Sequence, residues 1–570
     1  MPDNQAIAKK EKKKINWLYS LAINLAVLLF VLAFTEVLYE TNDDFAISRM
    51  ISDGYPYCRF VNYFMCRILI FIQEFFAEIN VYMLSQIIAG FVSFTVFVKV
   101  LLDRRDNYTE IILAVMLVAF FSVDHYSSIQ FTKTAAVLMT AGLIWAVDNY
   151  THERTVPVFI AAFLLYYAGV AFRARGMFPA IGYAASYMIV WWTINHREVF
   201  AKERLPKEAG LIALILVILF VPYGIDAASD RINEGTPELK YSREYQEERA
   251  LITDYPLMDF EDNREAYDAI GISENDIYLI DRWVFDYDGA ATLENMRAIN
   301  EINRPYVDDS MSITRGIKST LRNSFRSVAD RSFSGMHIVI VFAFAAYMLL
   351  ANKPRTWWYL LTTGAMTAAV YFSIYYMQRP QYRALYLGEL SAALWLAYAS
   401  VTGEKNQYPV RWKVGAVIAA AAMIVMVPQA KGILEWRVNH NREIVESQAV
   451  LDYWEEHPDQ FFVVPTTIMG QPPSYTEPMK RPSEPVNAAG TGGWETLTPY
   501  KLECLAKGGV YNPVKELVGD PDKIYVSDYL VPELTEYYNK WYCGENETID
   551  FVKVDEIGDL NLYNVVKEKR

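Results

Sequence analysis

Charged residues are scarce in this chain, and their scarcity excludes several classes of protein. Only 21% of its 570 residues are Asp, Glu, Lys or Arg, whereas 53% are hydrophobic. A single soluble domain of this length would be unusually apolar. The net charge of −14 excludes the basic face that a nucleic-acid-binding protein needs. We therefore expect no nucleic-acid partner.

Metal-binding and nucleotide-binding patterns are also missing. The chain has 6 histidines and 4 cysteines, and no C-x-x-C or H-E-x-x-H spacing occurs. P-loop, G-x-S-x-G and dinucleotide glycine patterns are absent. The first apolar segment is too long for a signal peptide, and no A-x-A site follows it. We expect this segment to be retained as a membrane span.

Long hydrophobic segments are abundant, and they indicate a membrane protein. Aromatic residues make up 15% of the chain, which is typical of proteins with many membrane interfaces. We predict an α-helical polytopic membrane protein with about eleven transmembrane helices, because the apolar blocks are long enough to cross a bilayer. The predicted spans are approximately 17–38, 81–102, 111–123, 129–147, 156–172, 177–194, 209–225, 336–350, 357–376, 384–401 and 414–428.

The distribution of positive charge predicts the orientation of these spans. Lysines crowd positions 9–14 ahead of the first span, and basic residues recur at the predicted inner ends of later spans. The positive-inside rule then places the N-terminus in the cytoplasm of a multi-pass cell-membrane protein. Residues 1–430 would form the membrane module, with a first outer loop at 39–80 and a large outer loop at 226–335. Residues 431–570 would form a small extracytoplasmic α/β domain, since short β-like runs follow a helical stretch there.

All four cysteines fall outside the membrane in this topology. Cys58 and Cys66 are too far apart to pair if their segment is helical throughout. Cys504 and Cys543 could form a disulfide across the C-terminal domain or remain free thiols.

Two adjacent carboxylates, Asp43 and Asp44, follow the first predicted span. Ionisable groups at a membrane boundary are costly, and they indicate function by default. The pair could act as a general base or as metal ligands, because an apolar neighbourhood raises the pKa of a carboxyl group. Alternatively, Thr41-Asn42-Asp43-Asp44 could cap the helix that follows. Both interpretations stay open at this point, and one residue could cap while the other reacts.

Arginines in the predicted outer loops are a second signal. Guanidinium groups bind phosphate in a bidentate manner, and positive charge on this side opposes the orientation rule. A lipid phosphate would suit these residues, whereas contacts with lipid headgroups or acidic neighbours are the alternative. Arg379 and Arg383 are the favoured phosphate contacts because they occupy a short loop between two spans. The full set is Arg59, Arg67, Arg173, Arg175, Arg379 and Arg383.

Some weaker signals could mark substrate-binding residues. Asp124 and His125 lie in the predicted second outer loop, and Lys133 in the following span could extend outward to it. Asp286 in the large outer loop stands near Trp283, and carboxylates and aromatic faces commonly bind sugars together. The alternative for each is a solvated loop residue.

The position of Asp43 and Asp44 after the first span, with an amphipathic stretch at 44–78 behind them, resembles the GT-C superfamily. These are integral-membrane glycosyltransferases with many spans, an acidic motif and surface helices in the first outer loop, and often a soluble domain after the last span. The chain looks most like bacterial members that use polyprenyl-phosphate sugars. The resemblance covers about residues 17–428 at the level of architecture.

This resemblance implies transfer of a sugar from a polyprenyl-phosphate donor to a saccharide, lipid or protein acceptor at the outer face, with inversion at the anomeric carbon. Asp43 or Asp44 would deprotonate the acceptor, and replacing either by Asn is expected to abolish transfer. Some relatives use a divalent metal such as Mg²⁺ or Mn²⁺ and others do not. No second acidic motif stands beside the first, so the metal ligands are unknown.

Two other classes of function fit the same features. One is a transporter or flippase of a lipid-linked saccharide, and the other is a non-catalytic membrane protein of envelope assembly. The chain shows no inverted repeat or paired broken helices, and large outer domains are unneeded for transport. In an assembly protein the acidic pair would serve only as a helix cap.

Overall fold

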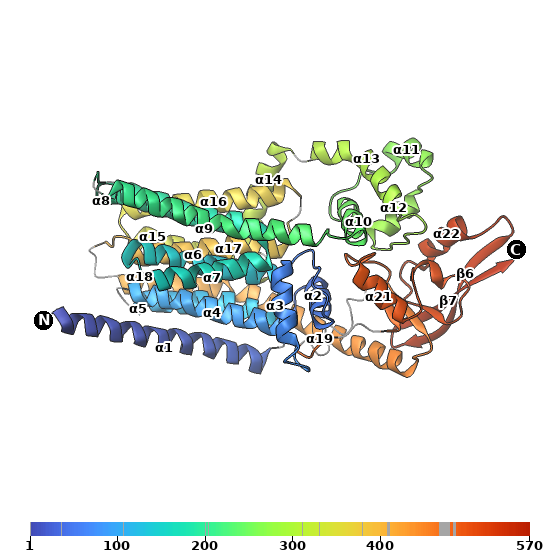
Figure 1. Cartoon of the computed structure of the whole chain (residues 1–570), viewed down its shortest axis with the longest axis horizontal. Coiled ribbons are helices and arrows are strands. Elements are labelled where there is room, and N and C mark those ends of the chain that lie inside the picture. The colour runs from blue at the N-terminus through green and yellow to red at the C-terminus, as the bar shows by residue number, and fades with distance from the viewer. Residues whose placement is uncertain are drawn as a thin grey trace.

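The computed structural model shows a helical bundle joined to a mixed α/β domain, with the two chain ends at opposite ends of the long axis (Figure 1). We call the end of the bundle nearer the α/β domain the cavity end, because a cavity described below opens there. The opposite end is called the N-terminal end. The structure describes residues 2–35, 37–105, 108–199, 201–202, 204–310, 312–329, 331–378, 380–406, 411–466, 479–482 and 486–569.

Within these residues, eleven helices run along the bundle. Eight candidate spans among them are long and apolar enough to cross a membrane, and α5, α7 and α16 complete the bundle. The prediction of a helical polytopic membrane protein is confirmed. The bundle helices are α1 (Pro2–Phe34), α4 (Val81–Arg104), α5 (Tyr108–Ser127), α6 (Phe131–His152), α7 (Val156–Phe172), α8 (Met177–Val199), α9 (Leu205–Ile232), α15 (Phe333–Ala351), α16 (Trp357–Tyr376), α17 (Tyr382–Thr402) and α18 (Arg411–Val425).

Helix polarity decides which helices lie at the centre of the bundle. Of the apolar windows, 89% of α6 and 94% of α17 are buried, against 17% of α1 and 11% of α9. The central helices carry buried ionisable residues such as Lys133 and Glu389, which need protein partners in a membrane. The apolar windows of α1 and α9 are mostly exposed and can face lipid.

The first loop forms two helices at the cavity end, α2 (Asn42–Ser52) and α3 (Tyr63–Gln73). They correspond to the predicted amphipathic stretch. Ahead of them, β1 (Leu38–Tyr39) pairs in parallel with β2 (Ser128–Ile129), which lies between α5 and α6. This short ladder fixes the start of the first loop against the centre of the bundle.

The large loop is helical and packs on the C-terminal domain. Asp286 accepts hydrogen bonds from Asn512 (2.7 Å) and Tyr537 (2.9 Å) of that domain. Asp286 is therefore a buried structural group instead of the sugar contact considered above. The helices of the loop are α10 (Pro237–Thr253), α11 (Arg264–Ala269), α12 (Glu274–Asp281), α13 (Leu293–Ser310) and α14 (Ile313–Val328).

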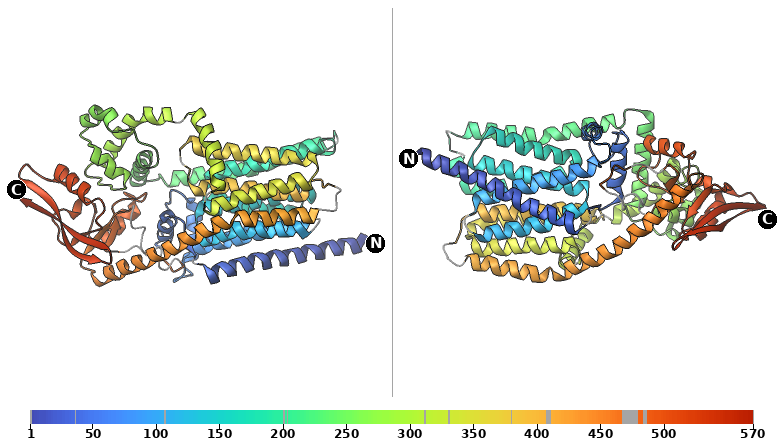
Figure 2. Two further views of the ribbon diagram at one scale, coloured as in Figure 1. Left: turned by 180° about the vertical axis from the view of Figure 1, so that it is seen from behind. Right: turned by 90° about the horizontal axis from the view of Figure 1, so that it is seen from below.

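The C-terminal domain is a five-stranded mixed sheet with helices, as predicted. A helix, α19 (Val427–Glu456), leaves the bundle and runs past position 430 to the sheet (Figure 2). The strand order is β4-β3-β5-β7-β6, with parallel β3–β4 and β3–β5 pairs and antiparallel β5–β7 and β6–β7 pairs. Its elements are β3 (Phe461–Val464), β4 (Ala488–Gly490), α21 (Pro499–Lys507), β5 (Lys523–Val526), α22 (Val531–Tyr542), β6 (Glu547–Ile557) and β7 (Leu560–Lys569).

The cysteines do not cross-link this domain. All four are described, and all are free thiols, including Cys504 and Cys543. The domain is held by its apolar core instead, in which Phe461 and Tyr525 are buried.

A buried ion pair docks the C-terminal domain on the first loop. Arg49 of α2 lies 3.0 Å from Glu495, and both side chains are nearly inaccessible to solvent. Tyr500 donates a hydrogen bond to Asp53 (2.8 Å) just after α2. These contacts place the loop before α21 directly over the cavity end of the bundle.

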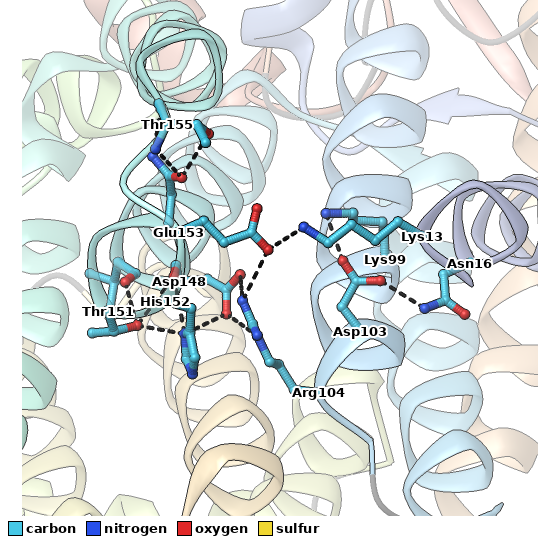
Figure 3. A network of polar contacts seen from close by, with 12 residues as sticks. Lys13, Asn16, Lys99, Asp103, Arg104, Asp148, Thr151, His152, Glu153 and Thr155 are labelled. Carbon is cyan, nitrogen blue, oxygen red and sulfur yellow. Dashed lines mark hydrogen bonds and ion pairs between the residues drawn. The ribbon is translucent and has the colours of Figure 1, made fainter. Parts of the chain in front are cut away.

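Ion pairs close the N-terminal end of the bundle (Figure 3). Arg104 of α4 makes a bidentate contact with Asp148 of α6 (2.8 and 3.0 Å). Lys13 of α1 contacts Glu153, and Asn16 donates to Asp103 (2.7 Å). The peripheral helix α1 is thereby tied by polar contacts to α4 and to the end of α6.

Candidate functional site

A cavity of about 430 Å³ opens at the cavity end of the bundle, where three parts of the chain meet. The bundle and its first loop, the large loop and the C-terminal domain all contribute side chains. The lining consists of Thr41, Asp43, Arg59, Phe60, Phe131, Arg173, Arg175, Arg249, Ala250, Asp254, Trp283, Gln381, Arg383, Thr466, Gly493 and Trp494.

Asp43 is the carboxylate of the predicted pair that faces this cavity. It lies in the first turn of α2, after the extended residue Thr41, whose side chain makes no capping hydrogen bond. The Asp43 side chain is 15% exposed, and its Oδ2 lies 3.5 Å from Nη2 of Arg383. Burial raises the pKa of Asp43, while the charges of Arg383 and Arg173 oppose that rise. An accessible carboxylate with a raised pKa has the properties of a general base.

Asp44 is buried in the bundle and does not line the cavity. Its Oδ1 accepts hydrogen bonds from the Tyr82 hydroxyl (3.0 Å), the Gln86 amide (3.2 Å) and the Phe131 backbone N–H (2.9 Å). Burial and the neighbouring Asp43 raise the pKa of Asp44 well above its usual range, against the effect of these hydrogen bonds. Asp44 therefore ties α2 to α4 and α6.

Arginines dominate the charge of the cavity. Arg173 follows α7, and its guanidinium lies over the rings of Phe60 (5.4 Å) and Phe131 (5.5 Å). Burial and repulsion from Arg175 and Arg383 lower the pKa of Arg173 to about 10. An anion that pairs with these guanidinium groups would offset the repulsion between them.

The large loop supplies another arginine to the cavity. Arg249 of α10 is buried, with its guanidinium 4.7 Å from the ring centre of Trp283. Burial lowers the pKa of Arg249 to about 10, and Asp254 opposes the change. The lining contains five arginines, Arg59, Arg173, Arg175, Arg249 and Arg383, against the two carboxylates Asp43 and Asp254.

The other predicted site residues are distributed as follows. Arg59, Arg173, Arg175 and Arg383 all line the cavity. Arg379 lies outside the described residues.

Asp124, His125 and Lys133 do not line the cavity. The first two belong to α5, which extends to Ser127, and not to a loop as predicted. All three side chains are fully buried in the bundle. His125 contacts the Gln86 carbonyl through Nε2 (3.2 Å). Lys133 does not extend outward as predicted, because buried carboxylates hold its ammonium group.

Those carboxylates belong to a buried ionic network whose members Glu40 and Tyr382 adjoin the lining residues Thr41 and Arg383 in the chain. The Lys133 ammonium lies 2.8 Å from Glu40 and 3.0 Å from Asp124. The Tyr382 hydroxyl donates to the other oxygen of Asp124 (2.7 Å). We define the buried ionic network as Glu40, Asp124, Lys133, His337, Tyr382 and Glu389, the last of which is 3.2 Å from His337 Nδ1.

Sequence reasoning missed Arg249, Asp254 and Trp494 as cavity residues, and it considered Trp283 only as an aromatic neighbour of Asp286. Trp494 belongs to the C-terminal domain and stacks edge-on against Phe60 at 4.8 Å. These residues come from segments distant in sequence from Asp43. The predicted pairing of Trp283 with sugar chemistry was the one available signal.

The cavity does not fit a divalent metal ion. Among the residues that the structure describes, no group of three or more His, Cys, Asp or Glu side chains could hold one. Mg²⁺ and Mn²⁺ need several oxygen ligands, whereas the two carboxylates here stand among five guanidinium groups.

The fold and the site define a polytopic membrane protein with a cationic cavity where its bundle meets the polar domains. No protein-family model matches the chain. No curated protein matches it either. Among solved structures, the chain is similar to one described as the crystal structure of ArnT from Cupriavidus metallidurans in the apo state. The identity is 11% and the TM-score 0.42, over 96% of this chain and 97% of that one. A likeness this weak shows neither a family nor an activity.

Proposed function

We propose that the chain is a GT-C-type membrane glycosyltransferase that moves a sugar from a polyprenyl-phosphate-linked donor to an acceptor hydroxyl. The position of Asp43 carries the proposal. Its carboxylate lies 3.5 Å from Arg383 in a cavity of about 430 Å³ with four further arginines in its wall. A base and a cationic site for a leaving phosphate therefore meet at the end of a membrane bundle, where a substrate can keep its lipid in the bilayer.

The proposed reaction is a single displacement with inversion. Asp43 accepts the proton of the acceptor hydroxyl as the acceptor oxygen bonds to the anomeric carbon. The bond from that carbon to the phosphate oxygen breaks, and its electron pair stays on the phosphate. Arg383 and Arg173 stabilise the charge that develops on the departing polyprenyl phosphate.

We place this reaction on the extracytoplasmic side of the cell membrane. The lysines at positions 9–14 lie in the first part of α1, at the N-terminal end of the bundle (Figure 1), and the positive-inside rule assigns that end to the cytoplasm. The cavity and the C-terminal domain would then lie outside. The acceptor is a saccharide, a lipid or a protein.

The test is transfer from a set of polyprenyl-phosphate sugars by the purified protein in lipid nanodiscs. Release of free polyprenyl phosphate together with a glycosylated acceptor supports the proposal. Movement of the intact donor between leaflets, with no new glycosidic bond, would instead identify a flippase. Absence of both transfer and flipping from the wild-type protein would instead indicate a non-catalytic role in envelope assembly.

Lysine substitutions test the phosphate contacts. Arg383→Lys and Arg173→Lys keep the positive charge but lose the bidentate geometry. We expect each to weaken donor use by roughly 1–3 kcal/mol, the value of a hydrogen bond to a charged group. The measurement is the transfer rate against donor concentration. Arg297→Lys is the matched control, because Arg297 pairs with Glu244 (2.8 Å) outside the cavity.

Arg175→Lys and Arg379→Lys complete the series of predicted phosphate contacts. If all four lysine variants match the control, these arginines do not bind the donor phosphate.

The pH dependence of transfer tests Asp43 as the base. Burial raises the pKa of Asp43, so activity should fall on the acid side with a midpoint above the ordinary aspartate pKa. Arg383 lowers that pKa, and Arg383→Met should therefore move the acid limb to higher pH. Asp254 raises it, and Asp254→Asn should move the limb to lower pH. Identical acid limbs for kcat/KM in all three proteins would contradict the assignment.

A further inference from the structure

α14 has an amphipathic surface that the cavity does not use. The helix packs across α15 and α16 at the cavity end, and Figure 2 shows it crossing the direction of the bundle helices. Gly316 and Thr320 form its buried side. A Cβ at Gly316 would lie 2.9 Å from the ring of Phe372, so glycine allows the helix backbone to sit against α16.

An apolar stripe on α14 remains exposed. Ile313, Ile317 and Leu321 follow one another at intervals of four residues, which places them on one face of the helix. Their exposed fractions are 66%, 50% and 58%. A stripe of large aliphatic side chains at this level of a membrane bundle is suited to contact with lipid.

A basic arc occupies the far side of the same helix. Lys318, Arg322 and Arg326 are exposed, and none forms an ion pair with another residue that the structure describes. Arg315 lies on the same arc. At 100° per residue, the centre of this arc is more than a third of a turn from the stripe. The helix therefore presents aliphatic groups in one direction and positive charge in another.

We infer that α14 is an interfacial helix that binds anionic phospholipids. The apolar stripe enters the boundary between acyl chains and headgroups, and the basic arc contacts the phosphates above it. The location supports this occupant, because α14 packs where the ends of two membrane helices meet water. Charge complementarity supports it as well, since the arc contributes positive charge only. This inference does not depend on the proposed transferase activity.

The test compares two triple variants of the full-length protein in nanodiscs that contain phosphatidylcholine and phosphatidylglycerol. Lys318→Gln, Arg322→Gln and Arg326→Gln together remove the arc. The matched control is Lys240→Gln, Arg264→Gln and Arg297→Gln, which removes three exposed charges of the same loop that already pair with acids. Native mass spectrometry measures how much phosphatidylglycerol each protein retains.

We expect wild-type protein and the control to retain phosphatidylglycerol in preference to phosphatidylcholine. The arc variant should bind it roughly fivefold more weakly for each charge removed, which corresponds to about 1 kcal/mol per basic residue near an anionic surface. High salt should reduce the preference of the wild type. Equal retention by the arc variant and the control would overturn the inference.

A photo-crosslinking residue at position 317 tests the apolar stripe separately. We expect benzoylphenylalanine introduced there to crosslink to phospholipid, whereas the same residue at exposed Leu251 of α10 should not. A crosslink from position 317 to a second copy of the chain or to another protein would identify a protein interface and contradict lipid insertion.

Discussion

Replacement of Asp43 by asparagine is expected to lower the rate of sugar transfer by roughly 10²–10⁴-fold, the usual contribution of a positioned general base. Asparagine has the size of aspartate and is equally acceptable at the start of a helix. It cannot accept a proton, and it removes the negative charge beside Arg383 at 3.5 Å. The variant should therefore fold and insert normally but fail in the chemical step. The measurement is kcat with saturating donor and acceptor.

Asp44→Asn is the matched control for this experiment. The buried Asp44 has a raised pKa, and its Oδ1 accepts three hydrogen bonds. An asparagine oxygen can accept the same three, so this variant should keep most of the activity. Asp44→Ala should instead lower stability, because it leaves buried donors unsatisfied. If Asp43→Asn keeps wild-type turnover while Asp44→Asn abolishes it, the assignment of the two residues is reversed.

The sequence-based expectation that either aspartate is essential treated the two as equivalent. Sequence position alone places both near the membrane boundary, and helical periodicity alone cannot tell which side of α2 faces a cavity. The distinction depends on Tyr82, Gln86 and Phe131, which reach Asp44 from two other helices. Only the packed bundle brings those partners together.

The membrane spans could be predicted because each is a local property of the chain. An apolar block of sufficient length specifies a helix and its burial in lipid without reference to other segments. Arg173, Arg175 and Arg383 could be found for the same reason, since each directly follows or precedes such a block. Their common cavity follows from the bundle, which brings the ends of α7 and α17 together.

Arg249 and Trp494 could not be recognised in the same way. Each lies in a long polar segment, and no local pattern separates Arg249 from the other basic residues of the large loop. Their role depends on docking of the large loop and the C-terminal domain over the cavity, through contacts such as Arg49–Glu495 (3.0 Å). Such contacts join residues hundreds of positions apart, and a single sequence does not reveal them.

Lys133 shows a different limit of sequence reasoning. A lysine in the first turn of a span is usually explained by extension toward water. Here Asp124 and Glu40 neutralise it inside the bundle, and its side chain is fully buried. The pairing of Lys133 with Asp124 and Glu40 could not be predicted from the sequence, because the three residues lie in three different segments of the chain.

Lys133→Met is accordingly expected to cause the largest loss of stability among single substitutions in the membrane module, about 3–5 kcal/mol. Methionine fills much of the space of the lysine stem but leaves Asp124, which is fully buried, and Glu40 without their positive partner. Uncompensated buried charge is far more costly than an exposed broken pair. Lys353→Met is the control, because the Lys353–Glu404 pair is about half exposed on both sides and should contribute less than about 1 kcal/mol.

The triple change Lys133→Met, Asp124→Asn and Glu40→Gln separates stability from positioning. Neutral side chains remove the unpaired charges, so the apparent melting temperature should recover most of what Lys133→Met alone loses. Activity should not recover in parallel, since Glu40 stands three residues before Asp43 and Tyr382 stands beside Arg383. The buried ionic network joins these two points through Lys133 and Asp124 and so holds the proposed base close to the arginine proposed to bind phosphate. Full recovery of kcat in the triple variant would show that the network only stabilises the bundle. A Lys133→Met protein as stable as the wild type would show that the buried charges are compensated elsewhere.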